Sequence, residues 1–105
     1  MVFRADIEVI FEFNNCRKRP IWNGYRPMHL ILDNYLTSGM HRFKGRDCVL
    51  PGEKAIGEIC FLTPEAYPNS CWIGKRICIQ EGERVVGWAT VTRVVNPILL
   101  SEKQD

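Results

Sequence analysis

Strict alternation of apolar and polar residues near the N-terminus is the feature that most limits the fold of this chain. Between residues 2 and 13, five apolar side chains fall on one face of an extended strand: Ala5, Ile7, Val9, Phe11 and Phe13. Three acids fall on the other face: Asp6, Glu8 and Glu12. A period of two residues is typical of a β-strand that buries one face and exposes the other. The sequence therefore predicts a half-buried strand over residues 2–13, with its acids in water.

Five more strand-like runs follow, and turn-forming residues separate them. They cover residues 25–32, 35–43, 55–61, 72–80 and 84–95. In the first of these runs Met28, Leu30 and Leu32 share one face, whereas the run at 55–61 is expected to make apolar contacts on both faces. Pro51-Gly52 and Glu81-Gly82-Glu83 are turn signals, Gly39 is a natural bulge or turn position, and residues 14–20 and 63–70 have loop composition.

Six short strands without a long amphipathic helix indicate a closed barrel or a sandwich, because a single sheet would leave its edges unpaired. A chain of 105 residues fits one hydrophobic core. We expect one β-barrel domain over residues 1–97 and a polar tail over residues 98–105.

Composition narrows the functional classes. The formal charge of +2 is too balanced for a domain that grips nucleic acid over its whole surface, so basic contacts are expected to be local. Neither a secretory leader nor a membrane-spanning segment is recognisable, which predicts a cytoplasmic protein without membrane contact. Five cysteines without a CxxC pair predict reduced thiols and no zinc knuckle.

The sequence gives little support for a nucleotide-binding, metal-binding or catalytic motif. Gly74-Lys75 is followed by Arg76 and not by Ser or Thr, so a nucleotide-binding P-loop is not predicted. His29 and His41 have a spacing that fits no common metal motif, and surface or strand-packing roles are favoured. A nucleophilic Cys48 activated by one of these histidines is the enzymatic hypothesis. We expect no enzyme activity, no cofactor and no metal.

Several short motifs occur in order along the predicted strands: residues 24–27 (Gly-Tyr-Arg-Pro), 50–53 (Leu-Pro-Gly-Glu), 61–64 (Phe-Leu-Thr-Pro) and 81–87 (Glu-Gly-Glu-Arg-Val-Val-Gly). In order and spacing they resemble the third, C-terminal domain of elongation factor Tu, from the first strand to Val95. Gly87 suits a point where a neighbouring strand approaches closely, and Gly82 suits a tight turn.

The resemblance implies a six-stranded antiparallel Greek-key β-barrel that is not catalytic. In that family the barrel packs against a GTP-binding domain, touches the T-arm side of aminoacyl-tRNA and meets the nucleotide-exchange factor. The matching contact positions here are Ser38, Glu81 and Gly82, and Arg84 belongs to the same hairpin. Met28 and Thr63 stand where the family carries Gln and, in some members, Lys.

Three functional hypotheses follow. The first is a binding module that docks a protein or RNA of the translation apparatus near Ser38 and the Glu81 turn. A basic and aromatic patch supports it, in which Arg17, Lys18 and Arg19 pair with Trp22, and Lys75 and Arg76 pair with Trp72. The second is a mimic of the elongation-factor barrel that binds a GTP-binding domain, an exchange factor or a toxin. The third is the Cys48 enzyme. The sequence favours docking to the translation apparatus and names neither the partner nor the oligomeric state.

Overall fold

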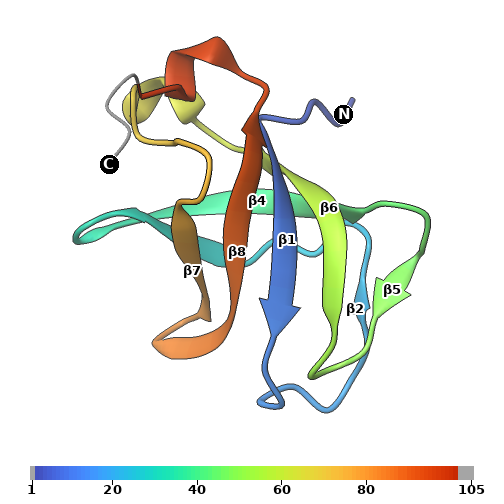
Figure 1. The fold of residues 1–105 in the computed structure, drawn as a ribbon. Coiled ribbons are helices and arrows are strands. Elements are labelled where there is room, and N and C mark those ends of the chain that lie inside the picture. The colour runs from blue at the N-terminus through green and yellow to red at the C-terminus, as the bar shows by residue number, and fades with distance from the viewer. Residues whose placement is uncertain (1, 102–105) are drawn as a thin grey trace.

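The structure is a computed structural model, and it describes residues 2–101. Six strands close an antiparallel barrel in the order β1-β6-β4-β3-β7-β8, and β8 pairs back to β1 (Figure 1). Their bounds are β1 Ile7–Phe13, β3 Met28–Leu32, β4 Tyr35–Phe43, β6 Lys54–Phe61, β7 Arg76–Glu81 and β8 Arg84–Val94. Helical structure within residues 2–101 consists of two 3-10 turns, η1 (Pro64–Ala66) and η2 (Pro97–Leu99). The prediction of an all-β, six-stranded barrel is confirmed.

The barrel interior is filled by the alternate residues of each strand, as expected for a small barrel. In β1 the inward residues Ile7, Val9, Phe11 and Phe13 are buried. Gly87 lies where β8 crosses β1, and a Cβ atom built there would stand 2.5 Å from the carbonyl oxygen of Glu12. The predicted close approach at Gly87 is therefore confirmed. Gly82 has a φ of 61° in the β7–β8 turn, which agrees with its predicted role.

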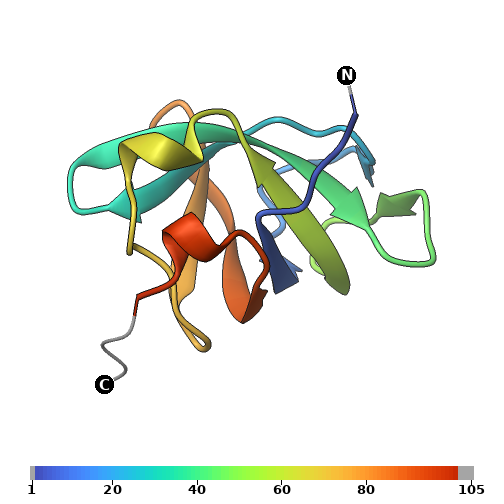
Figure 2. The ribbon, with the colours of Figure 1, turned by 90° about the horizontal axis from the view of Figure 1, so that it is seen from above.

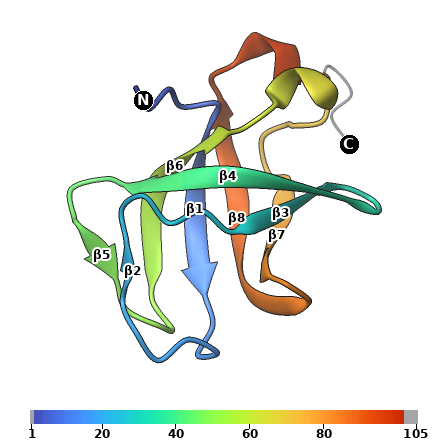
Figure 3. The same ribbon diagram turned by 180° about the vertical axis from the view of Figure 1, so that it is seen from behind.

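Several strand boundaries differ from the prediction. The first strand begins at Ile7 and not at residue 2, and β7 begins at Arg76 because Trp72 to Lys75 form a turn closed by the Lys75 N–H and the Trp72 carbonyl. Gly39 lies within β4 and makes no turn. Two short strands were not predicted at all: β2 (Ile21–Trp22) and β5 (Cys48–Val49) pair as a separate two-stranded sheet. This sheet lies on the opposite side of the barrel from β7 (Figure 3).

Two predictions about strand faces are refined by the structure. Met28, Leu30 and Leu32 share a face, and that face is the outer one, because their neighbours His29 and Ile31 fill the interior. In β6 the outward Ile56 is 59% exposed, so the expected apolar contacts on both faces are wrong at that position. Alternation identified both strands correctly but did not decide which side faced the core.

The expectation of solvated acids on β1 is wrong for Asp6, which is buried at the start of the strand. Its carboxylate accepts a hydrogen bond from the Phe61 N–H at 2.6 Å and another from the Asn96 side chain at 2.9 Å. Its carbonyl oxygen accepts the backbone N–H groups of Val95 and Asn96. Asp6 therefore joins β1, the end of β6 and the segment that follows β8.

The C-terminal segment is more ordered than the predicted tail. Leu99 is fully buried, and the Ser101 N–H donates to the Cys71 carbonyl at 2.8 Å. The part of the predicted tail at 102–105 lies outside the described residues. The two 3-10 turns contact each other and lie over one end of the barrel (Figure 2). Within residues 2–101 there is no helix of the length and apolarity needed to cross a membrane.

Candidate macromolecule-binding surface

The loop after β1 and the β7–β8 turn meet at the end of the barrel opposite the 3-10 turns (Figure 1). Their side chains line one shallow depression, the hairpin surface, made of Cys16, Arg17, Lys18, Arg19, Glu81 and Arg84. Two groups of residues that the sequence suggested separately, the basic loop and the Glu81 turn, therefore form a single surface.

Glu81 organises this surface. Its carboxylate accepts hydrogen bonds from Arg17 and from the Tyr25 hydroxyl, and Arg84 donates to its other oxygen at 3.0 Å. Burial alone would raise the pKa of Glu81, but hydrogen bonds from Tyr25, Arg84 and Arg17 outweigh that effect and lower it. Glu81 is thus ionised at neutral pH and holds two arginines in place.

The cations of the hairpin surface outnumber its acids. Four cationic side chains and one carboxylate line it, and Lys18 and Arg19 are exposed without an ion pair to residues 2–101. Arg17 stacks on Tyr25, with its guanidinium carbon 4.9 Å from the ring centroid. The predicted aromatic partner, Trp22, lies instead on β2 and is 59% exposed. Tyr25 is therefore the aromatic partner that sequence reasoning missed.

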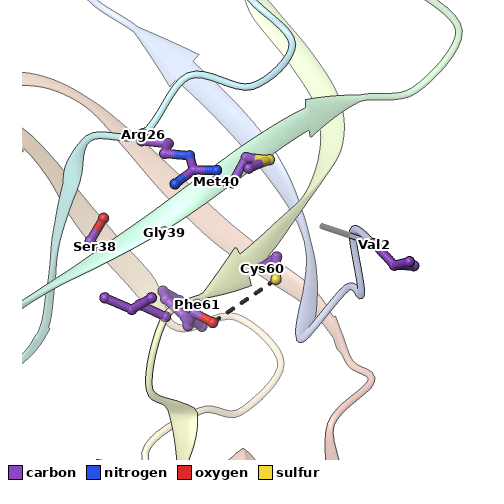
Figure 4. Close-up of a pocket in the computed structure, with 8 residues that line it drawn as sticks. Val2, Arg26, Ser38, Gly39, Met40, Cys60 and Phe61 are labelled. Atoms are coloured by element: carbon purple, nitrogen blue, oxygen red, sulfur yellow. Dashed lines mark hydrogen bonds between the residues drawn. The ribbon is translucent and has the colours of Figure 1, made fainter.

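Ser38 lies in a second depression, the Ser38 hollow, of about 230 Å³. It is lined by Val2, Arg26, Ser38, Gly39, Met40, Cys60, Phe61 and Leu62. Figure 4 shows Arg26 projecting from the segment before β3, whereas Ser38 projects from β4; both residues line the hollow. The Arg26 guanidinium is exposed and makes no ion pair or hydrogen bond with residues 2–101. An unpaired guanidinium that shares a hollow with a hydroxyl is suited to a phosphate or a carboxylate.

Strand register connects the two depressions. Ser38 pairs with Met28 across β4 and β3, and Met28 pairs with Gln80 across β3 and β7. These three half-buried side chains point outward, because Thr37, His29 and Ile79 beside them are buried. Gln80 is followed by Glu81, so the row leads from the Ser38 hollow to the hairpin surface.

A third depression, the tryptophan groove, lies on the outside of β3, β7 and β8, and it contains the predicted residues Trp72, Lys75 and Arg76. Lys75 lies over the Trp72 ring, with its Nζ atom 4.8 Å from the centroid, as the sequence suggested. Arg76 lies over Trp88 at 4.1 Å, a pairing that the sequence analysis missed. Arg76 and Glu81 are at opposite ends of β7, about 17 Å apart along the strand.

The histidines form a buried pair inside the barrel. Their Nε2 atoms are 2.7 Å apart, and His29 Nδ1 lies 3.1 Å from the Thr37 carbonyl oxygen. If His29 Nδ1–H donates to Thr37, its Nε2 accepts from His41, and His41 Nδ1 is left as a buried acceptor without a partner in residues 2–101. This agrees with the predicted strand-packing role.

Cys48, the nucleophile of the enzymatic hypothesis, lies on β5 and is half-buried. No contact between its thiol and either histidine occurs within residues 2–101. The same residues contain no group of three His, Cys, Asp or Glu side chains arranged to hold a metal ion. Within the described residues, Cys48 is therefore not brought to either histidine.

The structure thus places Ser38, Glu81, Gly82, Arg84 and Arg17 to Arg19 along one connected surface. It places Trp72, Lys75 and Arg76 in a separate groove, and Trp22 apart from both. No model of a known protein family matches this chain.

Proposed function

We propose that this protein is a non-catalytic binding module that docks an RNA component of the translation apparatus. The contact surface runs from the Ser38 hollow to the hairpin surface. The observation that carries the proposal is the register that joins Ser38 to Met28 and Gln80, because it leads from Ser38 to the neighbour of Glu81. Ser38 and Glu81 are positions that the resemblance to elongation factor Tu assigns to RNA contact.

The barrel is compatible with that resemblance. Its first strand lies beside β6 and β8 and not beside β3, the strand order of a Greek key. The number of strands and their antiparallel pairing are those that the resemblance implies. These features support the family proposal.

Charge supports RNA as the partner. Lys18 and Arg19 at the hairpin surface and Arg26 at the Ser38 hollow have no carboxylate partner in residues 2–101. Glu81 lies between Arg17 and Arg84 and fixes their positions. The surface thus combines arginines held by Glu81 with cations that have no acidic partner. Such a set suits the phosphates of a folded RNA, which a protein recognises by their positions and not by base sequence.

Replacement of Lys18, Arg19 and Arg26 by glutamine is expected to weaken tRNA binding by roughly tenfold or more at low salt. It should also reduce the slope of log affinity against log salt by about three, since three phosphate contacts are lost. Fluorescence anisotropy of labelled tRNA at several salt concentrations measures both quantities. The matched control replaces Lys44, Lys54 and Arg93, which removes the same charge from the turn after β4, from β6 and from β8. Equal losses in both triple variants, or no tRNA binding at low salt, would contradict the proposal.

A protein partner is the second candidate, and the outer apolar residues favour it. Met28 replaces the family's Gln in the middle of the row, and Leu62 beside the Ser38 hollow is 72% exposed. A GTP-binding domain, an exchange factor or a toxin could dock on such residues. Size-exclusion chromatography with a purified elongation-factor GTP-binding domain, using Leu62→Ser and Met28→Gln as variants, distinguishes this candidate. Co-elution that both variants abolish would favour the protein partner over RNA.

A further inference from the structure

The tryptophan groove is a separate depression of about 550 Å³, within the size range of pockets that hold small ligands. Its floor is the outer face of β3, β7 and β8, and the loop before β7 forms one wall. It is lined by Leu30, Ile31, Leu32, Asp33, Asn69, Ser70, Trp72, Lys75, Arg76, Cys78 and Trp88. The groove uses none of the hairpin-surface residues.

Two flat indole rings line the groove, and each is paired with a cation. Lys75 lies over Trp72 and Arg76 lies over Trp88. Neither indole N–H has a hydrogen-bond partner within residues 2–101. Leu30 aligns with Cys78 and then with Trp88 across three strands, which gives an apolar floor beside the rings. A planar ligand with polar edges matches this lining.

The charge of the groove favours an anion. Arg76 is exposed and forms no ion pair or hydrogen bond with residues 2–101. Lys75 donates to the carbonyl oxygens of Ile31 and Ser70 and has no carboxylate of residues 2–101 within ion-pair distance. Burial lowers the pKa of Lys75. Asp33 is the acid among the lining residues, so two basic side chains face one carboxylate.

Lys75 also makes the groove rigid. Its ammonium joins the Ile31 carbonyl of β3 to the Ser70 carbonyl of the loop before β7, and its chain lies against Trp72. The ring of Trp72 is therefore held in place before a ligand arrives. A preformed aromatic wall lowers the entropy cost of binding a flat ligand.

We propose that the tryptophan groove binds a nucleotide of single-stranded RNA, with the base against the indole rings and the phosphate at Arg76. Stacking on aromatic side chains together with a cation for the backbone is how single-stranded nucleic acid is held without sequence preference. An acidic peptide would use the cation but would leave the rings and the free indole N–H groups unmatched. The site is independent of the hairpin surface.

The test uses the full chain with Trp22→Phe, so that the tryptophan fluorescence comes from Trp72 and Trp88. A four-nucleotide single-stranded RNA is expected to quench this fluorescence in a saturable way. Arg76→Gln should weaken the binding roughly fivefold or more, because the phosphate loses its cation and Trp88 loses its stacked partner. The matched control is Arg42→Gln, which removes an arginine that lies 4.2 Å from the Phe3 ring centroid elsewhere on the barrel. It should leave the affinity unchanged.

Two further ligands separate stacking from charge alone. An abasic oligomer with the same number of phosphates and a tetraglutamate peptide should each bind at least roughly tenfold more weakly than the RNA. Equal binding of either ligand, equal losses for Arg76→Gln and Arg42→Gln, or no quenching by the RNA would overturn the proposal. Because tRNA docking is measured with the Lys18, Arg19 and Arg26 variant, failure of the groove leaves the proposed function standing, and the reverse also holds.

Discussion

Lowering the pH from about 7 to about 5 is expected to reduce the free energy of unfolding by about 4 kcal/mol, because two histidines must remain neutral inside the barrel. Burial lowers the pKa of His29 to about 4. Burial and the neighbouring His29 lower the pKa of His41 well below its usual value. Since many domains have only 5 to 15 kcal/mol of stability, this loss is expected to be a large part of the total.

Among residues 2–101, no charged side chain contacts the histidine pair. The rings of Phe11, Phe13 and Tyr25 pack against His41, and Phe61 packs against His29. The polar contact of His29 besides His41 is the Thr37 carbonyl, which cannot replace a carboxylate as the partner of an imidazolium. A proton added to either ring would therefore place an unpaired charge in the core.

The sign of the effect follows from the unfolded chain. In the unfolded chain both histidines titrate near pH 6.5. Below that pH the unfolded state therefore binds protons that the folded state does not bind. Stability is full above pH 6.5 and is lost as the pH falls toward 4, by about 2 kcal/mol for each histidine at pH 5. The pKa of Glu53 is lowered by hydrogen bonds from the Leu50 N–H and Arg46, so this carboxyl stays ionised in the same range.

Urea unfolding of the natural sequence and of the double variant His29→Leu/His41→Leu measures this loss. These are the two histidines of the chain, so the double variant should lose most of its pH dependence between pH 7 and 5. His41→Leu alone should retain about half of it, because His29 still titrates. An unchanged slope in the double variant would show that other groups cause the acid sensitivity.

The barrel could be predicted because each strand of this chain has a recognisable local sequence pattern. The period of two residues in β1 and the glycine turn at Gly82 need no knowledge of distant partners. The side of a strand that faces the core was less certain in β3. There Met28, Leu30 and Leu32 alternate with His29 and Ile31, and hydrophobicity favours the first set. The chain buries the histidine face, where the two imidazoles share a hydrogen bond and His29 also contacts the Thr37 carbonyl.

The residues of the candidate site could be predicted from the sequence, but the contacts between them could not. Glu81 meets Arg17 across 64 positions and Tyr25 across 56, and Trp88 meets Arg76 through the register of β7 and β8. Such contacts depend on how the barrel closes, and the spacing of residues in the sequence does not predict that. Trp22 shows the same limit, since it is near Arg17 in sequence but pairs with Cys48 in the two-stranded sheet.

Asp6→Ala is expected to lower the free energy of unfolding by about 3 to 5 kcal/mol, because two buried donors would lose their acceptor. The Asp6 carboxylate is the acceptor for the Phe61 N–H and for the Asn96 side chain, and both donors would lose it. An alanine methyl group can replace neither bond, and water has little access to a residue with 6% exposure.

Glu8→Ala is the matched control, since Glu8 lies two positions along the same strand and also carries a carboxylate. Its ion pair with Arg93, at 3.3 Å, is at the surface, and its loss should cost less than about 1 kcal/mol. Asp6→Asn keeps one acceptor oxygen and should recover about half of the loss, because one of the two donors is satisfied again. Denaturant unfolding at pH 7 compares the three variants. Equal costs for Asp6→Ala and Glu8→Ala would mean that Asp6 is solvated, as the alternation of β1 alone suggests, and that it does not join β1 to the end of β6.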